Sequence, residues 1–436
     1  MSGAREAAFS VLLSIENDKA YSNLSLDTCL KKTELSKQDA GLTTMLVYGV
    51  IARRLTLDYF LSKVAGRPIK KIQPPVRIIL RIAVYQMLFM EKIPARAAVN
   101  EAVLLAKRRK LGYASGFING VLRNFSRKMN SLQYPDQCKD ALFSMEVQYS
   151  CPQSLISFWQ ASYGKEAALA ILEQVNAVPP VFIRVNTLRI STEALQKELE
   201  TEGVKSRFSA TYPQALQLLS AAGLRGLSTF QKGLFFVQGL ASQMACEVLA
   251  PKPGETVFDF CAAPGGKSFN LALLMEGKGT VQAFDLYEHR VQLIQREAHR
   301  LGLENVICAK ENDAAKASPL LGEADRVLCD VPCSGLGVIR RKPEIRYKEL
   351  KAFDGLPDLQ YHILCEGAMH VRKGGTLVYS TCTLNPAENE EVLCRFLDGH
   401  ADFALCPFEK ADEGSLTLFP QKDGVDGFFI AKMRRC

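Results

Sequence analysis

An alternation of short apolar runs with helical segments begins at residue 254 and constrains the fold more than any other feature. The runs lie at 256–260, 280–285, 304–309, 326–330 and 375–380, and the last is Gly427–Ala431. Each is short enough to be a strand that is buried on both faces, and the intervening segments are long enough for helices. The alternation predicts a parallel, doubly wound α/β sheet of Rossmann-like type.

The region before this sheet is predominantly helical at first. Residues 3–128 carry apolar side chains at helical spacing, and Pro74, Pro75 and Pro94 stand where helices should begin. The pattern lapses over 129–150, which we expect to be a linker. The sequence therefore predicts an all-α domain over residues 1–130.

A mixed region lies between the helical domain and the sheet. Helical patterns are expected at 166–175 and 192–202, and short strands at 181–185, near 215–220 and at 234–237. We therefore expect a small α+β module over residues 145–250, followed by the α/β domain over residues 251–436. The chain is long enough for three domains, each with its own core.

A glycine-rich turn follows the first run of the predicted sheet. Its sequence is Cys261-Ala262-Ala263-Pro264-Gly265-Gly266-Lys267, and a helix is expected to begin near Ser268. Small residues let the backbone approach a ligand closely, and a helix N-terminus offers free N–H donors. The spacing matches neither a phosphate-binding P-loop nor a Gly-x-Gly-x-x-Gly dinucleotide turn, so ATP hydrolysis and NAD chemistry are disfavoured.

Acidic residues stand at the ends of three successive runs of the predicted sheet. Asp285 ends the second run, Asp313 follows the third after Asn312, and Asp330 ends the fourth. Ligands bind beyond the carboxyl ends of such strands, where Asp285 could hold a ribose diol and Asp313 an adenine amino group. The series predicts a nucleoside-type cofactor, and S-adenosylmethionine fits best. Asp330 could contact either this cofactor or the edge of a cytosine ring.

Two cysteines lie just beyond strand ends that should open onto the same crevice. Cys333 follows Asp330-Val331-Pro332, and Cys382 follows Tyr379-Ser380-Thr381. Cytosine C5 is a poor nucleophile until a thiolate adds to C6, after which C5 takes a methyl group and a base removes its proton. The basic residues 340–342 and a cationic sulfonium could stabilise a thiolate here. One thiol can attack while the other assists release.

Positive charge is concentrated in the N-terminal region. The net charge is +8, but residues 1–130 hold 22 Lys and Arg against 9 Asp and Glu, a net of +13, which leaves −5 for the rest. Dense basic runs lie at Arg53-Arg54, Lys70-Lys71 and Lys107–Lys110. Such a distribution favours contact with a nucleic-acid backbone over a merely solvated basic face.

The remaining composition favours a reduced cytoplasmic protein. We find no apolar stretch of about 18 residues and no signal-peptide pattern at Met1–Glu6. The thirteen cysteines are scattered rather than arranged as a disulfide framework. With five histidines and no Cys-x-x-Cys, no metal site is expected, and no membrane contact or obligate protein partner is indicated.

The motifs together resemble those of the RNA cytosine-5 methyltransferases of the Nol1/Nop2/Sun family. The matching segments are Asp259–Ser268, Asp285–Arg290, Asp330–Gly335, Tyr379–Thr383 and Asn385–Glu390. The first domain is similar to NusB-type antitermination domains through residues 117–123, and Arg184–Thr187 resembles the family's RNA-binding region. Residues 337–345 are similar to the members that act on 16S ribosomal RNA of the small subunit.

This resemblance implies an activity and a division of roles between the thiols. The expected reaction is S-adenosylmethionine-dependent methylation of C5 of a specific cytosine in 16S ribosomal RNA. In the RNA family the Ser-Thr-Cys thiol attacks, which makes Cys382 the nucleophile and leaves adduct release to Cys333; DNA enzymes attack with the other thiol. The chain departs from the family pattern at Asn312, where glycine is usual, and at Val331, where alanine is usual.

Two alternative functions are compatible with parts of this pattern. One is 5-methylcytosine formation in another RNA, such as transfer RNA or a different ribosomal site. The other is a non-catalytic RNA-binding factor of the antitermination type, which would use only the basic helical domain. The intact glycine turn and the presence of both Cys333 and Cys382 favour an enzyme.

Overall fold

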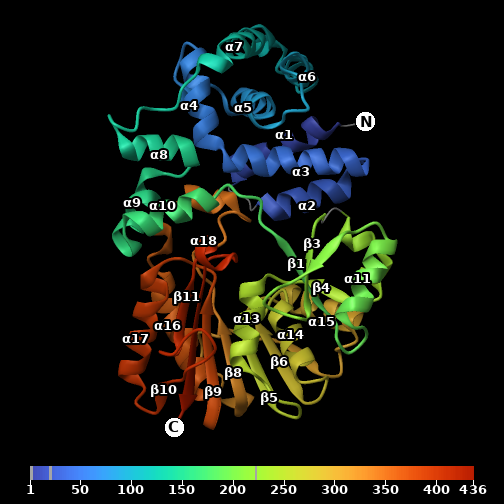
Figure 1. The fold of residues 1–436 in the computed structure, drawn as a ribbon, viewed down its shortest axis with the longest axis vertical. Coiled ribbons are helices and arrows are strands. Elements are labelled where there is room, and N and C mark those ends of the chain that lie inside the picture. Colours follow the sequence, from blue (N-terminus) through green and yellow to red (C-terminus); the bar gives the residue numbers. More distant parts are fainter. Residues whose placement is uncertain (1–2, 19–21, 221–222) are drawn as a thin grey trace. The chain divides into compact units, whose positions relative to one another are not determined.

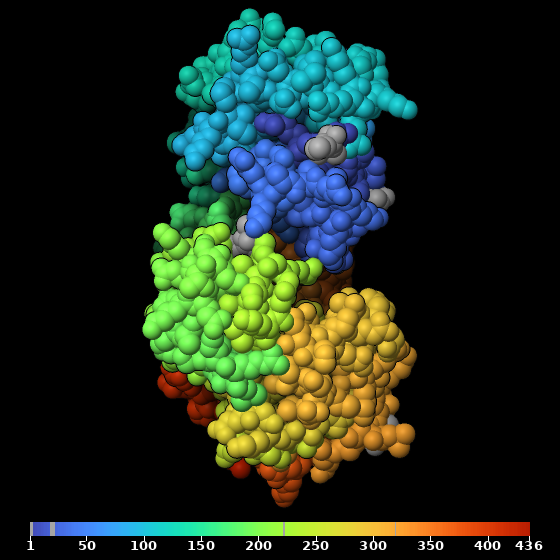
Figure 2. Space-filling view, turned by 90° about the vertical axis from the view of Figure 1, so that its right-hand side faces the viewer, coloured from blue at the N-terminus to red at the C-terminus, as the bar shows by residue number. Residues whose placement is uncertain are grey.

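The computed structural model describes residues 3–18, 22–220 and 223–436. The chain forms two compact units, which can be followed by their sequence colours in Figures 1 and 2. A helical unit contains Met1–Val178 and Ile339–Lys348, and an α/β unit contains Pro179–Val338 and Glu349–Cys436.

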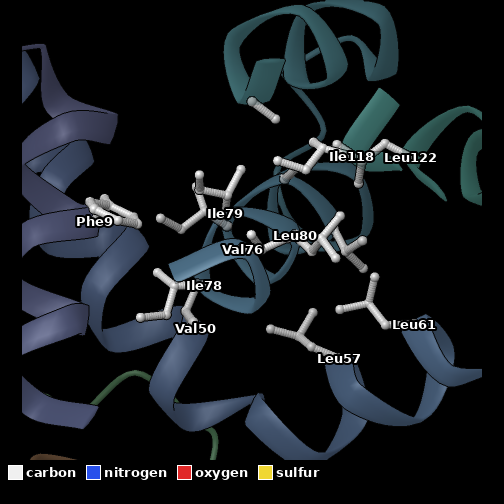
Figure 3. Close-up of a cluster of buried hydrophobic side chains, with 14 of the residues drawn as sticks. Phe9, Val50, Leu57, Leu61, Val76, Ile78, Ile79, Leu80, Ile118 and Leu122 are labelled. Atoms are coloured by element: carbon white, nitrogen blue, oxygen red, sulfur yellow. The ribbon is translucent and has the colours of Figure 1, made fainter. Parts of the chain in front are cut away.

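The helical unit is built around α5, which begins at Pro74 as predicted. The surrounding helices also include α6, which begins directly after Pro94. The helices of this region are α1 (Ala4–Asp18), α2 (Ser22–Lys32), α3 (Lys37–Ala52), α4 (Arg54–Val64), α5 (Pro74–Phe89), α6 (Ala95–Arg108) and α7 (Ser115–Lys128). Apolar side chains such as Phe9, Ile79 and Leu122 from three of these helices meet in one core (Figure 3). Their burial is the main source of stability for this unit.

Three more helices complete the helical unit, and one of them lies in the segment predicted to be a linker. They are α8 (Ala141–Tyr149), α9 (Gln153–Tyr163) and α10 (Lys165–Gln174). The sequence pattern failed at α8 because its apolar face is short. Asp140 nevertheless caps the helix, since its carboxylate accepts a hydrogen bond from the backbone N–H of Phe143 at 2.9 Å.

A strap from the second half of the sequence, Ile339–Lys348, also belongs to the helical unit. Its Arg346 is almost fully buried. The guanidinium donates to the Val175 carbonyl at 2.8 Å and to Oδ1 of Asn176 at 3.0 Å. Because a buried charge without partners is costly, these hydrogen bonds fix the strap in place.

The α/β unit begins with a small antiparallel sheet in the order β2-β3-β1-β4. Its elements are β1 (Val181–Val185), α11 (Thr192–Thr201), β2 (Ser206–Phe208), β3 (Ala215–Leu218), α12 (Ser228–Gln231) and β4 (Phe235–Val237). Strands β1, β3 and β4 and helix α11 confirm the predicted α+β pattern. Strand β2 was missed because its three residues, Ser206–Phe208, include no run of apolar side chains.

The main sheet is the predicted doubly wound α/β sheet, with strand order β10-β12-β9-β8-β5-β6-β7 and β11 paired to β12. Strands β5 to β9 are parallel, and β12 is antiparallel to β9. The strands are β5 (Thr256–Phe260), β6 (Thr280–Asp285), β7 (Ile307–Glu311), β8 (Ala324–Asp330), β9 (Val371–Thr381), β10 (Phe403–Leu405), β11 (Ser415–Leu418) and β12 (Phe428–Arg435). The short edge strands β10 and β11 were not predicted.

Helices cover both faces of this sheet (Figure 1). They are α13 (Leu240–Leu249), α14 (Gly266–Leu274), α15 (Glu288–Leu301), α16 (Leu356–Met369) and α17 (Glu390–Gly399), and a short α18 (Pro420–Asp423) precedes β12. Side chains alternate between two cores: Val257 packs with α13 to α15, and Phe258 packs with α16 and α17. Because β5 pairs with β6 on one side and β8 on the other, the chain reverses direction across the sheet at β5 and β8. That switch point is where α/β sheets bind ligands.

No helix within the described ranges is long and apolar enough to cross a membrane.

Candidate active site

The glycine-rich turn lies at the switch point, directly after β5. Cys261 and Gly265 both have positive φ angles, +62° and +103°. A Cβ atom at Gly265 would lie 2.3 Å from the Phe269 ring, whereas nothing lies within 4 Å of a Cβ built at Gly266. The turn therefore requires glycine at 265 and leaves open space over the N-terminus of α14. This is the shape of a backbone cradle for a ligand.

Asp285, at the end of β6, is held close to the turn. Its Oδ2 accepts from the Ala263 N–H at 3.2 Å and its Oδ1 from the Tyr287 N–H at 3.3 Å, while Arg290 lies 3.7 Å from Oδ1. The carboxylate is thus oriented by the backbone beside the cradle. The Asp285 carbonyl also accepts from the N–H of Asn312, which connects the ends of β6 and β7.

Asp313 follows β7 and is more exposed. Its carboxylate accepts from the Ala315 N–H at 3.2 Å and pairs with Lys316 at 2.9 Å. The hydrogen bond from Lys316 lowers the pKa of Asp313, so the group is a carboxylate near neutral pH. Beside it, the buried Nδ2 of Asn312 has no hydrogen-bond partner among the described residues.

Asp330, at the end of β8, is the most strongly bound of the predicted acids. Lys267 of the glycine turn donates to its Oδ2 at 2.6 Å, and Ser380 of β9 donates to its Oδ1 at 2.8 Å. Burial lowers the pKa of Lys267, but the nearby Asp330 carboxylate outweighs this and leaves that pKa above its ordinary value. The ion pair therefore connects the turn after β5 to the ends of β8 and β9.

Two residues beside the turn, Asp259 and Ser268, form a contact to which the sequence analysis assigned no role. Asp259 is fully buried on β5, and burial raises its pKa to about 7. Ser268 donates to its Oδ2 at 2.5 Å, while its Oδ1 has no hydrogen-bond partner among the described residues. Burial also raises the pKa of Cys261, so this thiol stays protonated and acts as a packing residue of the turn.

The structure brings the two predicted thiols together. The sulfur atoms of Cys333 and Cys382 lie 3.1 Å apart, and both residues are partly exposed. The contact with Cys382 and burial hold the pKa of Cys333 well above its ordinary value. A protonated Cys333 can donate its S–H to Cys382, and such a hydrogen bond stabilises a thiolate on Cys382.

Glu388 connects the loops that carry the two thiols. This fully buried carboxylate accepts from the Ser334 N–H, from Gln360 and from Asn385, each at 2.8 Å. Ser334 also shares a 2.6 Å hydrogen bond with Thr383, the residue after the second thiol. The sequence motifs included Glu388 only within the longer match Asn385–Glu390, because nothing local signals that Gln360, 28 residues away, would contact it.

A close backbone contact also fixes the loop after Cys333. The Gly337 N–H donates to the Cys382 carbonyl at 3.2 Å, and the Gly427 N–H donates to the Gly337 carbonyl at 2.9 Å. A Cβ atom at Gly337 would lie 2.1 Å from the Gly427 carbonyl oxygen. Any larger residue at 337 would therefore displace the loop next to Cys382.

The basic run Lys107–Lys110 is not uniform in the structure. Lys107, Arg108 and Lys110 are exposed. Arg109 is half-buried, pairs with Glu6 at 3.2 Å and lies over the Phe9 ring at 5.3 Å. Three of the four side chains are therefore available to an external anion, while Arg109 stabilises the contact between α1 and α6. The basic residues 340–342, which follow Cys333 in the sequence, also belong to the helical unit.

The residues present fit S-adenosylmethionine. The open cradle over Gly266, the backbone-oriented Asp285 and the unpartnered Nδ2 of Asn312 line three neighbouring strand ends. Such a set suits a nucleoside with a diol and an amino group. Within the described ranges no group of His, Cys, Asp and Glu side chains has the arrangement of a metal site.

Comparison with known proteins relates each region to a family. Residues 246–434 match the family described as 16S rRNA methyltransferase RsmB/F, residues 2–127 match the NusB family, and residues 151–225 match the ferredoxin-like domain of RsmF/B-like methyltransferases. The probable ribosomal RNA small subunit methyltransferase B of Bacillus subtilis is 40% identical, with 99% of this chain and 98% of that protein covered. The corresponding protein of Synechocystis is 37% identical over the full length of both chains.

Solved structures agree with these matches. The crystal structure of the protein PH0851 covers 100% of this chain and 98% of its own, with a TM-score of 0.84 and 29% identity. A methyltransferase homolog protein from Pyrococcus horikoshii covers 68% of this chain and 99% of its own, with a TM-score of 0.61 and 29% identity.

Proposed function

Because the chain belongs to the ribosomal RNA small subunit methyltransferase B family, we propose that it methylates C5 of a specific cytosine in 16S ribosomal RNA. The observation that carries the proposal is the pair of thiols 3.1 Å apart, just beyond the ends of β8 and β9, in the same sheet as β5 with its glycine-rich turn. In methylation of cytosine C5, one thiol of such a pair can add to C6 and the other can assist release. The names of the relatives support small-subunit ribosomal RNA as the substrate. The pair of thiols supports cytosine as the modified base.

The cofactor would lie over the turn formed by Cys261, Ala262, Ala263, Pro264, Gly265, Gly266 and Lys267. Asp285 would accept hydrogen bonds from the ribose hydroxyls and Asp313 from the adenine amino group. S-adenosylmethionine supplies an electrophilic methyl group on a positively charged sulfur. Asp330, held by Lys267 and Ser380, would orient either the cofactor or the cytosine edge.

Cys382 would act as the nucleophile. Its thiolate adds to cytosine C6, which forms a C–S bond and moves the ring electrons to C5, where the methyl group is accepted. This choice follows the family resemblance, in which the thiol of the Ser-Thr-Cys motif attacks. The 3.1 Å contact supports it, because a protonated Cys333 can donate its S–H to a thiolate on Cys382.

Cys333 would assist release of the product. A base removes the C5 proton, the C5–C6 double bond re-forms, and the Cys382 thiolate leaves. The 3.1 Å contact between the two sulfur atoms supports this role, because the bond to be broken would be the one to the Cys382 sulfur. Glu388 would hold both loops in register through Ser334 and Asn385.

The helical unit would supply RNA affinity through its exposed basic residues. Lys107, Arg108 and Lys110 are accessible, and a NusB-type fold with net positive charge suits phosphate contacts. We expect the enzyme to act in the cytoplasm, where both thiols stay reduced and ribosomal RNA is available.

The test is methylation of unmodified RNA transcripts by the purified full-length protein. We expect 5-methylcytidine in 16S ribosomal RNA after nuclease digestion and mass spectrometry, at a single position by bisulfite sequencing. Transfer RNA transcripts serve as the comparison. A different methylated nucleoside, or transfer RNA as the better substrate, would contradict the proposal.

A further inference from the structure

A hollow of about 540 Å³ lies in the helical unit, and none of its lining residues belongs to the basic run Lys107–Lys110. It is formed by the ends of α3, α5, α8 and α10 and by the loop before α8. Its walls include Arg53, Phe89, Tyr134, Gln148, Tyr149 and Glu173. Pockets for small ligands typically have volumes of about 300–1,000 Å³, so the hollow can take a group the size of a nucleotide.

Arg53 is a cation that this hollow leaves without a counterion. Its guanidinium lies 5.0 Å above the centre of the Phe89 ring and donates to the Gln148 carbonyl at 3.4 Å. No carboxylate among the described residues pairs with it. Burial lowers the pKa of Arg53 by more than the nearby Tyr134 raises it, so the site destabilises a positive charge that an anion would stabilise.

The aromatic walls of the hollow are held in place without a ligand. Tyr134 is 45% exposed, and its ring packs edge-on against Phe60 at 5.0 Å. Phe89 packs against Tyr85 at 5.4 Å. Phe89 is half-buried and lies under the Arg53 guanidinium, so Tyr134 is the exposed ring of the hollow. An exposed aromatic face that is fixed by its neighbours is a platform on which an unpaired base can stack.

Polar groups complete the lining. The side-chain amides of Gln137 and Gln148 are exposed and hydrogen-bond to no other described residue. Glu173 is exposed at the α10 end of the hollow. Amides and a carboxylate can read the amino and carbonyl groups of a base edge, while a guanidinium binds phosphate.

We propose that this hollow binds one unpaired nucleotide of the substrate RNA, with its base on the exposed ring of Tyr134 and its phosphate on Arg53. The inference rests on the proposed function, because it names a second contact for the same RNA. A protein segment is the less suitable occupant, since the hollow combines an unpaired cation with aromatic platforms rather than a continuous apolar surface. The site would recognise single-stranded RNA and not a duplex.

The test measures binding of 16S ribosomal RNA transcripts to the full-length protein and to two variants. Tyr134→Ala removes a platform that is already exposed, and we expect about a tenfold loss of affinity, as is typical when one stacked base is lost. Arg53→Gln should flatten the salt dependence of log Kd by about 0.7, the share of one phosphate in single-stranded RNA. Tyr113→Ala is the matched control, because Tyr113 is 70% exposed in the same unit and lines another surface.

Photo-crosslinking locates the contact directly. With 4-thiouridine in the transcript, we expect a crosslink within residues 129–139 that is lost in Tyr134→Ala and kept in Tyr113→Ala. Wild-type affinity in both hollow variants together with no crosslink in 129–139 would overturn the inference. If the wild-type protein still forms 5-methylcytidine in that case, only this inference fails, whereas absence of methylation by the wild type would contradict the proposed function itself.

Discussion

The loops behind the two thiols and the hollow around Arg53 differ in whether their buried polar groups have partners inside the protein. Behind the thiols, the Glu388 carboxylate is matched by donors from Ser334, Gln360 and Asn385. In the hollow, the Arg53 guanidinium is partly desolvated but has no carboxylate partner among the described residues. The first arrangement fixes the geometry of the two loops. In the second, an anionic ligand would gain binding free energy by pairing with Arg53.

The comparison teaches how each region should respond to mutation. Where all partners are internal, a substitution changes the free energy of unfolding and the geometry of the site together. Where the partner is external, a substitution changes ligand affinity and leaves folding nearly unchanged. The predictions below separate these two behaviours.

The largest effect is expected from Cys382→Ala. This variant lacks the thiolate that adds to C6, so methylation should fall to background while S-adenosylmethionine binding, measured by calorimetry, stays at the wild-type value. Cys308→Ala is the control, because Cys308 is an exposed cysteine of the same unit outside the site. Retained methylation in Cys382→Ala would remove Cys382 from the chemistry.

A stability effect is expected from Glu388→Gln. The new glutamine would turn its NH₂ group toward donors that need an acceptor. Leaving one buried polar group unsatisfied costs about 1–3 kcal/mol of unfolding free energy. Urea denaturation should show this loss, and methylation should decline because the loops of both thiols shift. Glu391→Gln, on the neighbouring and exposed position, should do neither. Unchanged stability in Glu388→Gln would mean that the network does not hold the loops.

Asp285→Ala should weaken cofactor binding, and it should also lower stability because the Ala263 and Tyr287 N–H groups lose their acceptor. Loss of a carboxylate that accepts from ligand hydroxyls costs about 1.5–3 kcal/mol, so S-adenosylmethionine affinity should fall roughly 10-fold to 150-fold. Calorimetry measures this directly, and circular dichroism controls for folding. Wild-type affinity with an intact fold would remove Asp285 from the cofactor site.

The smallest effects belong to the exposed basic residues. Replacing Lys107, Arg108 and Lys110 by alanine, with Arg109 retained because it pairs with Glu6, should lower RNA affinity and flatten the salt slope by about 2. Replacement of Arg109 alone should instead lower thermal stability. If the triple variant keeps the wild-type slope, this run is a solvated face and the RNA binds elsewhere.

The sequence predicted the elements whose signal is local. The limits of β5 and β6 match the predicted runs, because a strand buried on both faces is a continuous apolar run, and Pro74 marks the first turn of α5. The edge strands β10 and β11 were missed, because three or four half-buried residues carry no period.

For the candidate site, the motifs indicated which residues to consider but not which of them would be in contact. Strand-end position alone predicted that Cys333 and Cys382 would share a crevice, and the 3.1 Å contact confirms that they lie together. The links from Lys267 to Asp330 and from Gln360 to Glu388 join residues far apart in the sequence. Such pairings follow from the packing of the sheet and its helices, which no local pattern encodes.

The division of labour between the thiols is tested most directly by Cys333→Ala. If Cys382 attacks and Cys333 releases, this variant should still form the C–S bond and methylate once, but the adduct should persist. A denaturing gel should then show a slow protein–RNA band that requires both Cys382 and RNA and that nuclease collapses. Accumulation of the band in Cys382→Ala and its absence in Cys333→Ala would contradict the account and reverse the two roles.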